Sequence, residues 1–184
     1  STDGFVQGRG VSVDEFLEEG KKEDPSFYAV VIGVSEYANA NINLTFPEKD
    51  AEAISTSIQL GAENLFGEER THVYTISTAS TTLPSKTNIK AVFDKIALTA
   101  KAEDVIVVYL SGHGVTWSSG TESDFYFLTS DATAANKEAY ADPQIRASRT
   151  ISTNEWVDYL KAIAALKQVM IIDACGSGQA IETL

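Results

Sequence analysis

The sequence predicts an α/β protein with a mostly parallel sheet and helices on both of its faces. Short apolar runs, typical of strands buried on both sides, occupy residues 28–34, 105–110 and 169–172, and a weaker run occupies residues 73–76. Helical patterns lie between successive runs. Because strands and helices alternate along the chain, we expect the strands to run parallel and to be joined by right-handed crossovers.

Three helices are predicted between these strands. Apolar residues recur at helical spacing within residues 51–58 and again within residues 89–96. A third helix is predicted to begin at Ser152, because Ser152 and Glu155 have the spacing of a capping box. This last helix is expected to bury its apolar side chains, which are Trp156, Leu160 and Ile163.

The chain divides into a polar leader and one folded domain. Residues 1–26 are rich in charged side chains, which is typical of a leader or linker, and residues 27–184 form the predicted domain. Within that domain, residues 125–128 predict a short strand or hairpin. Residues 129–150 are rich in Ala, Asp and Asn and predict a long surface loop.

Charge and cysteine content limit the function of the chain. Its 14 Lys and Arg residues are outnumbered by 26 Asp and Glu residues, which gives a formal net charge of −12. Nucleic acids and anionic membranes need clustered basic residues, so neither is an expected partner. The only cysteine, Cys175, excludes an internal disulfide and a multi-cysteine metal site. The chain shows no membrane-spanning run and no secretory signal pattern, and we expect a cytoplasmic location.

Two motifs follow predicted strands. Ser111-Gly112-His113-Gly114 follows the strand at 105–110, and Asp173-Ala174-Cys175-Gly176-Ser177-Gly178 follows the last strand. Ligands of parallel α/β sheets bind beyond the carboxyl ends of the strands. If these two strands are neighbours, His113 and Cys175 face each other across one crevice.

A thiol beside an imidazole is suited to nucleophilic catalysis. A free thiol is mostly protonated at neutral pH, and an adjacent imidazole can accept its proton and later protonate a leaving amine. The N–H groups of Cys175 and Gly114 are candidates for an oxyanion hole. His113 is expected on a flexible loop and His72 at the surface. The alternative for Cys175 is inert packing, because a lone cysteine beside a buried strand is commonly a small core residue.

In these residues the chain resembles the caspase-like cysteine peptidases, and metacaspases and bacterial homologues more than animal caspases. The resemblance extends over most of the chain and rests on five motifs in the family's order, which span residues 28–34, 48–51, 111–114, 124–131 and 173–178. It implies a three-layer caspase-like fold. It also implies hydrolysis of peptide bonds by a dyad of His113 and Cys175.

The resemblance further implies a specificity pocket for Arg or Lys. Asp173 stands two residues before the cysteine, where caspases that cleave after aspartate have glutamine. Asp50, in a motif that resembles the metacaspase Asn-Asp-Ala, and Ser111 are the other implied pocket residues. Two neighbouring carboxylates repel each other unless a cation neutralises them, and a guanidinium can do so with bidentate hydrogen bonds. Lys49 stands where the family motif has asparagine.

The resemblance also implies a partner. Only residues 176–184 follow Cys175, so we expect this chain to be the large (p20-like) subunit of a caspase-like domain. A small (p10-like) subunit from the same precursor, released by autoprocessing, would cover an otherwise exposed sheet edge. The implied role is regulated proteolysis in cell death or in bacterial defence. No cofactor is expected; calcium activates many metacaspases, but no calcium site is identifiable in these residues.

Three other readings fit part of the sequence. Legumain-like and gingipain-like peptidases of the same clan share the His-Gly and Ala-Cys pairs at strand ends. A non-catalytic caspase-like module that binds or regulates a protease would share the fold without the activity. A flavodoxin-like domain that binds a small molecule agrees with the strand and helix order, but no glycine-rich phosphate loop follows Val34.

Overall fold

The computed structural model describes residues 24–119, 122–134 and 136–175. The polar leader therefore lies outside the described residues except for its last three positions. None of the helices described is long and apolar enough to cross a membrane.

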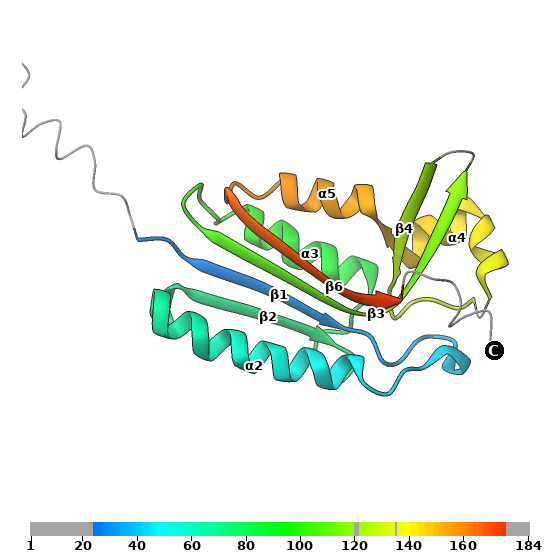
Figure 1. The fold of residues 1–184 in the computed structure, drawn as a ribbon, viewed down its shortest axis with the longest axis horizontal. Helices are drawn as coiled ribbons and strands as arrows, with labels where there is room; N and C mark the ends of the chain where they lie inside the picture. The colour runs from blue at the N-terminus through cyan, green and yellow to red at the C-terminus, as the bar shows by residue number, and fades with distance from the viewer. Residues whose placement is uncertain (1–23, 120–121, 135, 176–184) are drawn as a thin grey trace, which may run out of the picture.

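Four parallel strands form the centre of the fold (Figure 1). Strand β1 (Phe27–Gly33) pairs on one side with β2 (Thr71–Ser77) and on the other with β3 (Val105–Ser119), and β3 also pairs with β6 (Lys167–Cys175). The order across the parallel sheet is thus β2, β1, β3 and β6. All four predicted strands are confirmed, and so is their parallel direction.

Strand β3 is much longer than predicted, and its second half belongs to a different ladder. From Gly114 onward it pairs antiparallel with β4 (Glu122–Leu128), and β4 pairs antiparallel with the short β5 (Thr150–Ser152). Figure 1 shows this part of β3 turning away from the parallel strands together with β4. The predicted strand or hairpin at 125–128 is therefore confirmed as part of β4.

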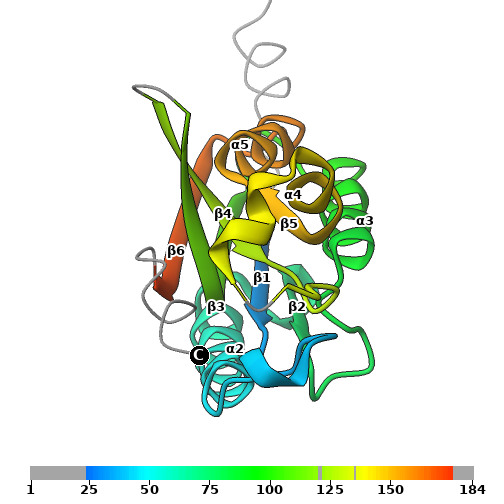
Figure 2. The same ribbon diagram turned by 90° about the vertical axis from the view of Figure 1, so that its right-hand side faces the viewer.

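Helices cover both faces of the sheet (Figures 1 and 2). Helix α2 (Pro47–Phe66) lies on one face, and α3 (Lys86–Ala97) and α5 (Thr153–Lys161) lie on the other. The capping box at Ser152 is present as predicted, since its hydroxyl accepts from the Glu155 N–H and the Glu155 carboxylate accepts from the Ser152 N–H. Two short 3₁₀ helices, η1 (Ala40–Ile42) and η2 (Glu68–Arg70), complete this half of the chain.

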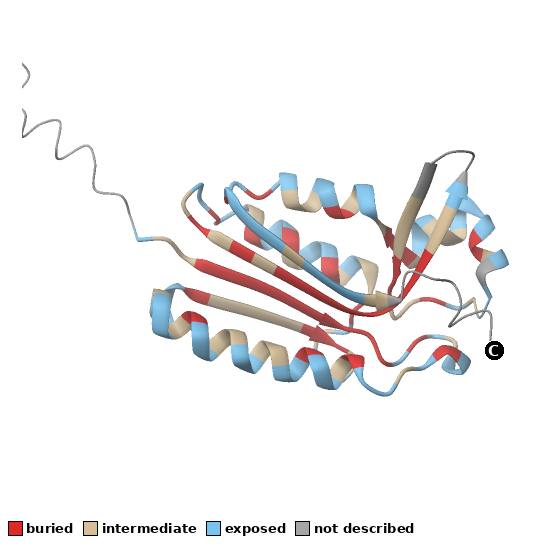
Figure 3. Cartoon of the chain, viewed as in Figure 1, coloured by how far each residue is buried: buried red, intermediate tan, exposed pale blue. Residues whose placement is uncertain are grey.

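The apolar run in β1 is continuous because both of its faces are buried (Figure 3). Tyr28, Val30 and Ile32 point to the layer of α3 and α5, while Ala29 and Val31 point to α2. Gly33 ends the strand where α2 begins. A Cβ on Gly33 would lie 2.6 Å from the Cβ of Ala51 and closer still to the Pro47 carbonyl oxygen, so only glycine allows this helix to approach.

The prediction of a long surface loop at 129–150 is wrong. The segment contains a 3₁₀ helix, η3 (Lys137–Ala141), and an α-helix, α4 (Pro143–Arg149), and the ring of Tyr140 is fully buried. The start of helix α4 is stabilised by local residues. The Asp142 side chain accepts from the Gln144 N–H, and Pro143 occupies the first turn. The Asn and Asp residues that suggested a loop therefore include the N-caps of two short helices, Asn136 of η3 and Asp142 of α4.

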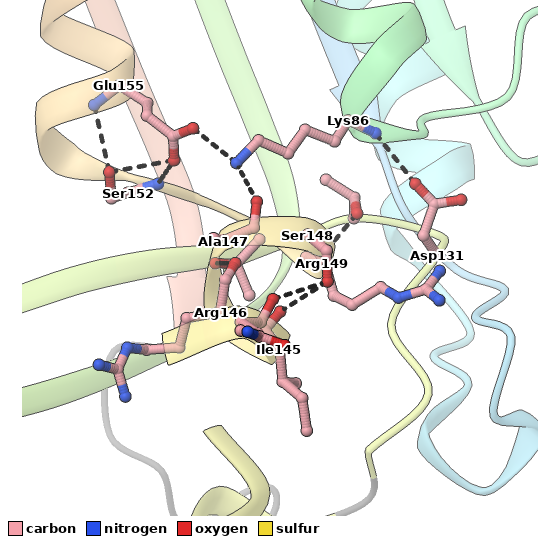
Figure 4. A network of polar contacts seen from close by, with 12 residues as sticks. Lys86, Asp131, Ile145, Arg146, Ala147, Ser148, Arg149, Ser152 and Glu155 are labelled. Atoms are coloured by element: carbon pink, nitrogen blue, oxygen red, sulfur yellow. Dashed lines mark hydrogen bonds and ion pairs between the residues drawn. The ribbon is translucent and has the colours of Figure 1, made fainter. Parts of the chain in front are cut away.

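One lysine ties this segment to the helical layer (Figure 4). The Lys86 Nζ lies 2.5 Å from a carboxylate oxygen of Glu155 and donates to the Ala147 carbonyl oxygen at 2.6 Å. The backbone N–H of Lys86 donates to Asp131 at 3.1 Å. Burial opposes ionisation of Glu155, but Lys86 and the Ser152 N–H outweigh it and lower the pKa of that carboxyl. Helices α3, α4 and α5 are thus joined through Lys86.

Candidate active site

The two motifs singled out in the sequence lie side by side. The parallel register of β3 and β6 pairs Ser111 with Asp173, Gly112 with Ala174 and His113 with Cys175. The prediction that the two strands are neighbours is therefore confirmed, although 111–114 and 173–175, the described parts of the two motifs, lie inside the strands and not in loops beyond them. The backbone of Cys175 is the last described residue of β6, and its side chain lies outside the described part of the chain.

His113 is buried in β3, so its predicted placement on a flexible loop is wrong. Only 4% of the residue is exposed. Its backbone N–H donates to the Tyr37 hydroxyl oxygen at 2.9 Å, and its Nε2 lies 2.8 Å from the Ile42 carbonyl oxygen. The chain continues as a strand here because β3 changes partner, from β6 to β4, without a break at His113.

The contact with Ile42 fixes the tautomer of the imidazole. A carbonyl oxygen can only accept, so the Nε2 of His113 carries the proton and Nδ1 is left as the basic nitrogen of the neutral ring. Burial lowers the pKa of His113, and the bond to Ile42 partly offsets that effect. The side chain is therefore a neutral base at neutral pH.

Tyr37 and Ile42 were not identified from the sequence. They lie between the first strand and the first long helix, in a segment without strong periodicity, and contact His113 from there. The position of Tyr37 beyond the carboxyl end of β1 was the available signal. Its ring centroid lies 5.2 Å from that of His113, and burial raises its pKa above the usual range.

Gly112 allows Tyr37 to reach His113. Its φ is +154°, and a Cβ at this position would lie 3.1 Å from the Tyr37 hydroxyl oxygen and 3.3 Å from the ring of Phe127. A larger residue would displace the hydroxyl that accepts from the His113 N–H. The glycine before the histidine is thus needed for close packing. Gly114, the second predicted oxyanion-hole residue, is the first residue of β3 to pair with β4.

The three predicted specificity residues line one pocket. Asp50, Ser111 and Asp173 surround a cavity of about 380 Å³. Its remaining lining is mainly the segment that enters α2, together with the neighbouring strand positions: Leu44, Thr45, Phe46, Pro47, Gly112 and Ala174. Asp50 and Asp173 are exposed, while Ser111 is buried. Lys49 is exposed and does not line the cavity.

Asp50 is held by the hydrogen bonds that start α2. The Glu48 N–H donates to the Ser35 hydroxyl at 3.0 Å, and the Thr78 hydroxyl donates to the Glu48 carboxylate at 2.8 Å. These contacts connect the beginning of α2 to the ends of β1 and β2. Asp50 therefore occupies the first turn of a helix whose start is fixed to the sheet.

A tyrosine not identified from the sequence contacts one of the two pocket carboxylates. The Tyr109 hydroxyl donates to the Asp173 carboxylate at 3.2 Å. Burial raises the pKa of Tyr109, and the negative charges of Asp173 and Asp50 raise it further, so the phenol remains protonated. Both carboxylates therefore influence one buried hydroxyl group.

His72 takes no part in this arrangement. It lies in β2 and is half-buried, with its ring centroid 4.9 Å from that of Tyr28, and is thus less exposed than predicted. Within the described ranges, no group of three or more His, Cys, Asp or Glu side chains is arranged to hold a metal ion.

The chain is similar to known proteins in sequence pattern and in fold. The family model described as the caspase domain matches residues 26–183, while no curated protein matches the chain. Among solved structures, the crystal structure of protein GSU0716 from Geobacter sulfurreducens is similar in fold, with a TM-score of 0.55 at 16% sequence identity. The similarity covers 82% of this chain and 51% of that one, so this chain spans about half of that protein's length. With its three-layer α/β fold and a family match along nearly its whole length, the chain belongs to the caspase domain family of peptidases, peptidase C14.

Proposed function

We propose that the protein is a cysteine endopeptidase in which His113 and Cys175 form the catalytic dyad and cleavage follows an Arg or Lys residue. The observation that carries the proposal is the register of β3 and β6. It pairs His113 with Cys175 two positions beyond the pair of Ser111 and Asp173. A candidate nucleophile and its base thus lie next to a candidate specificity pocket.

The chemistry follows from the tautomer of His113. Nδ1 accepts the thiol proton, and the thiolate of Cys175 forms a bond to the carbonyl carbon of the substrate. The imidazolium then returns the proton to the leaving amine as the C–N bond breaks, which leaves a thioester. A water molecule, deprotonated by the same imidazole, hydrolyses the thioester and restores the thiol. The N–H groups of Gly114 and Cys175 are the proposed donors to the oxyanion.

The charge of the pocket supports basic specificity. Two carboxylates and two hydroxyl-bearing residues, Thr45 and Ser111, line it, and none of its lining residues is basic. Because both carboxylates are exposed, water screens their mutual repulsion, and charge alone gives modest selectivity. A substrate guanidinium should bind more tightly than charge attraction alone allows, since its planar fork can form paired hydrogen bonds with carboxylates.

The exposure of strand β6 supports the proposal of a partner subunit. Among the described residues β6 pairs only with β3, and Val169, Ile171 and Ile172 on it are each about half exposed. Figure 3 shows this strand as largely exposed, in contrast to the buried β1. We propose that a small, p10-like subunit of a metacaspase-like precursor covers this edge after autoprocessing, and that the protein acts in regulated proteolysis.

Peptide hydrolysis tests the proposed function. The full-length protein is assayed with matched fluorogenic peptides that end in Arg, Lys or Asp, alongside the Cys175→Ala variant. We expect the Arg and Lys peptides to be cleaved and the variant to be inactive. Preference for Asp peptides would contradict the proposed basic specificity. If none of the peptides is cleaved, the proposed peptidase activity is contradicted.

Labelling with iodoacetamide at neutral pH separates an enzyme from a non-catalytic caspase-like module. An activated thiol reacts rapidly, and the reaction slows in a His113→Gln variant because the proton acceptor is lost. A thiol that reacts no faster than free cysteine in both proteins would favour the module.

A further inference from the structure

We propose that Tyr109 is a positioning residue that orients the Asp173 carboxylate and thereby favours Arg over Lys in the specificity pocket. The inference rests on the proposed function, because it concerns the same pocket. It begins with one contact: the Tyr109 hydroxyl donates to one carboxylate oxygen of Asp173 at 3.2 Å.

The packing around Tyr109 holds its side chain, and therefore the donor of this hydrogen bond, in one position. Tyr109 lies two residues before Ser111 on β3, so both side chains share the sheet face that α2 covers. The ring is packed with Ala29, Val31 and Ala51, and only 6% of the residue is exposed. Asp173, in contrast, is exposed on the edge strand β6. A rigid, buried donor therefore holds a carboxylate that would otherwise rotate in water.

The hydroxyl is a permanent donor at physiological pH. Burial and the charges of Asp173 and Asp50 keep the phenol protonated. Ser111 and Asp173, two residues of the pocket, both affect the pKa of this hydroxyl, which Ser111 lowers and Asp173 raises. Since the donor occupies Oδ2 of Asp173, the orientation of the carboxylate plane is set before a substrate binds.

Orientation matters unequally for the two basic side chains. A guanidinium presents a planar fork whose paired hydrogen bonds require a carboxylate in a matching plane. A lysine ammonium is a compact charge that accepts many directions of approach. Loss of the Tyr109 hydroxyl should therefore weaken Arg binding and leave Lys binding nearly unchanged.

The test compares Tyr109→Phe with Tyr28→Phe in the full-length protein. Tyr28 is also buried in the sheet, on the opposite face, and its hydroxyl lies 3.4 Å from that of Thr99, away from the pocket. For Tyr109→Phe we expect a loss of about fivefold in kcat/KM for the Arg peptide, carried by KM, as one hydrogen bond is worth about this factor. The Lys peptide should change by less than about twofold, and Tyr28→Phe should leave the Arg to Lys ratio unaltered.

Several outcomes would overturn the inference. An unchanged Arg to Lys ratio in Tyr109→Phe, or an equal loss with both peptides, means that Tyr109 has only a structural role. A wild-type protein that cleaves neither peptide overturns the proposed specificity itself and this inference with it. Cleavage by the wild type with an unchanged ratio in the variant overturns the inference alone.

A double-mutant cycle keeps the inference testable if Tyr109→Phe lowers stability. If Tyr109 acts through Asp173, then Tyr109→Phe has no further effect on the ratio once Asp173 is replaced by alanine. Binding of Arg-ending and Lys-ending peptides to proteins that also carry Cys175→Ala gives the same comparison without turnover. Additive effects in both measurements would contradict a role through Asp173.

Discussion

The burial of His113 has a measurable effect on stability. Burial lowers the pKa of His113 from its ordinary value of 6.5, so the unfolded chain binds a proton at a higher pH than the folded chain does. The free energy of unfolding should therefore fall as the pH drops below about 6.5, and the loss is complete below the folded pKa. Urea unfolding between about pH 5 and pH 7 measures this slope.

A His113→Gln variant is the control for this slope. Glutamine does not titrate, so we expect the variant to lose less stability than the wild type over the same pH range. The lowered pKa of Glu155 contributes only at pH values below its ordinary value of 4.5, which separates the two groups. Identical slopes in wild type and variant would show that His113 does not titrate differently on folding.

Tyr37 is predicted to stabilise the backbone at the candidate site. In Tyr37→Phe the His113 N–H loses its acceptor while it remains buried, which should cost roughly 1–3 kcal/mol of unfolding free energy. Tyr28→Phe removes a hydroxyl with a longer, 3.4 Å contact and should cost less. Equal losses in urea unfolding would mean that the two hydroxyls are equivalent and that Tyr37 has no special role.

At the scale of the elements, Lys86 is expected to stabilise the helical layer more than its neighbour on α3. The Lys86 and Glu155 side chains are 19% and 35% exposed, against 54% and 58% for Lys90 and Asp94. Lys86→Met should therefore cost about 1–2 kcal/mol, because it removes the ion pair to Oε1 of Glu155 and the hydrogen bond to the Ala147 carbonyl oxygen. Lys90→Met should cost less than about 0.5 kcal/mol, as for a surface pair. Thermal unfolding of both variants measures the two losses of stability, and losses of similar size would contradict the prediction.

Predictions from the sequence were correct for elements with a regular apolar period. The strands β1, β2, β3 and β6 were predictable because each contains a short apolar run, although only β1 is buried along its whole length and β6 is largely exposed. Helix α5 was predictable because Ser152 and Glu155 cap it locally. The segment 129–150 was not, since Tyr140 is buried by tertiary contacts that no local pattern records. Its local signals were the caps at Asn136 and Asp142 and Pro143 in the first turn of α4.

At the candidate site, strand-end motifs identified the residues but not their surroundings. His113, Asp50, Ser111 and Asp173 could be found because each belongs to a short motif with a meaning in the family. The Ile42 carbonyl and the Tyr109 hydroxyl could not, because they reach the site through the path of the backbone and the register of the sheet. Backbone acceptors in particular have no side-chain signature in a sequence.

For the whole molecule, we expect β6, which pairs only with β3 among the described residues, to make the isolated chain prone to association. An exposed edge with apolar side chains can pair with another strand, and Val169, Ile171 and Ile172 provide such an edge. We expect Ile172→Lys to shift the isolated chain toward monomer in sedimentation velocity. Leu98 directly follows α3, does not belong to β6 and is 87% exposed, so Leu98→Lys controls for a general gain in solubility. An equal shift in both variants would mean that association does not use β6, and a wild-type chain that is monomeric at all concentrations would contradict the exposed edge as a pairing surface.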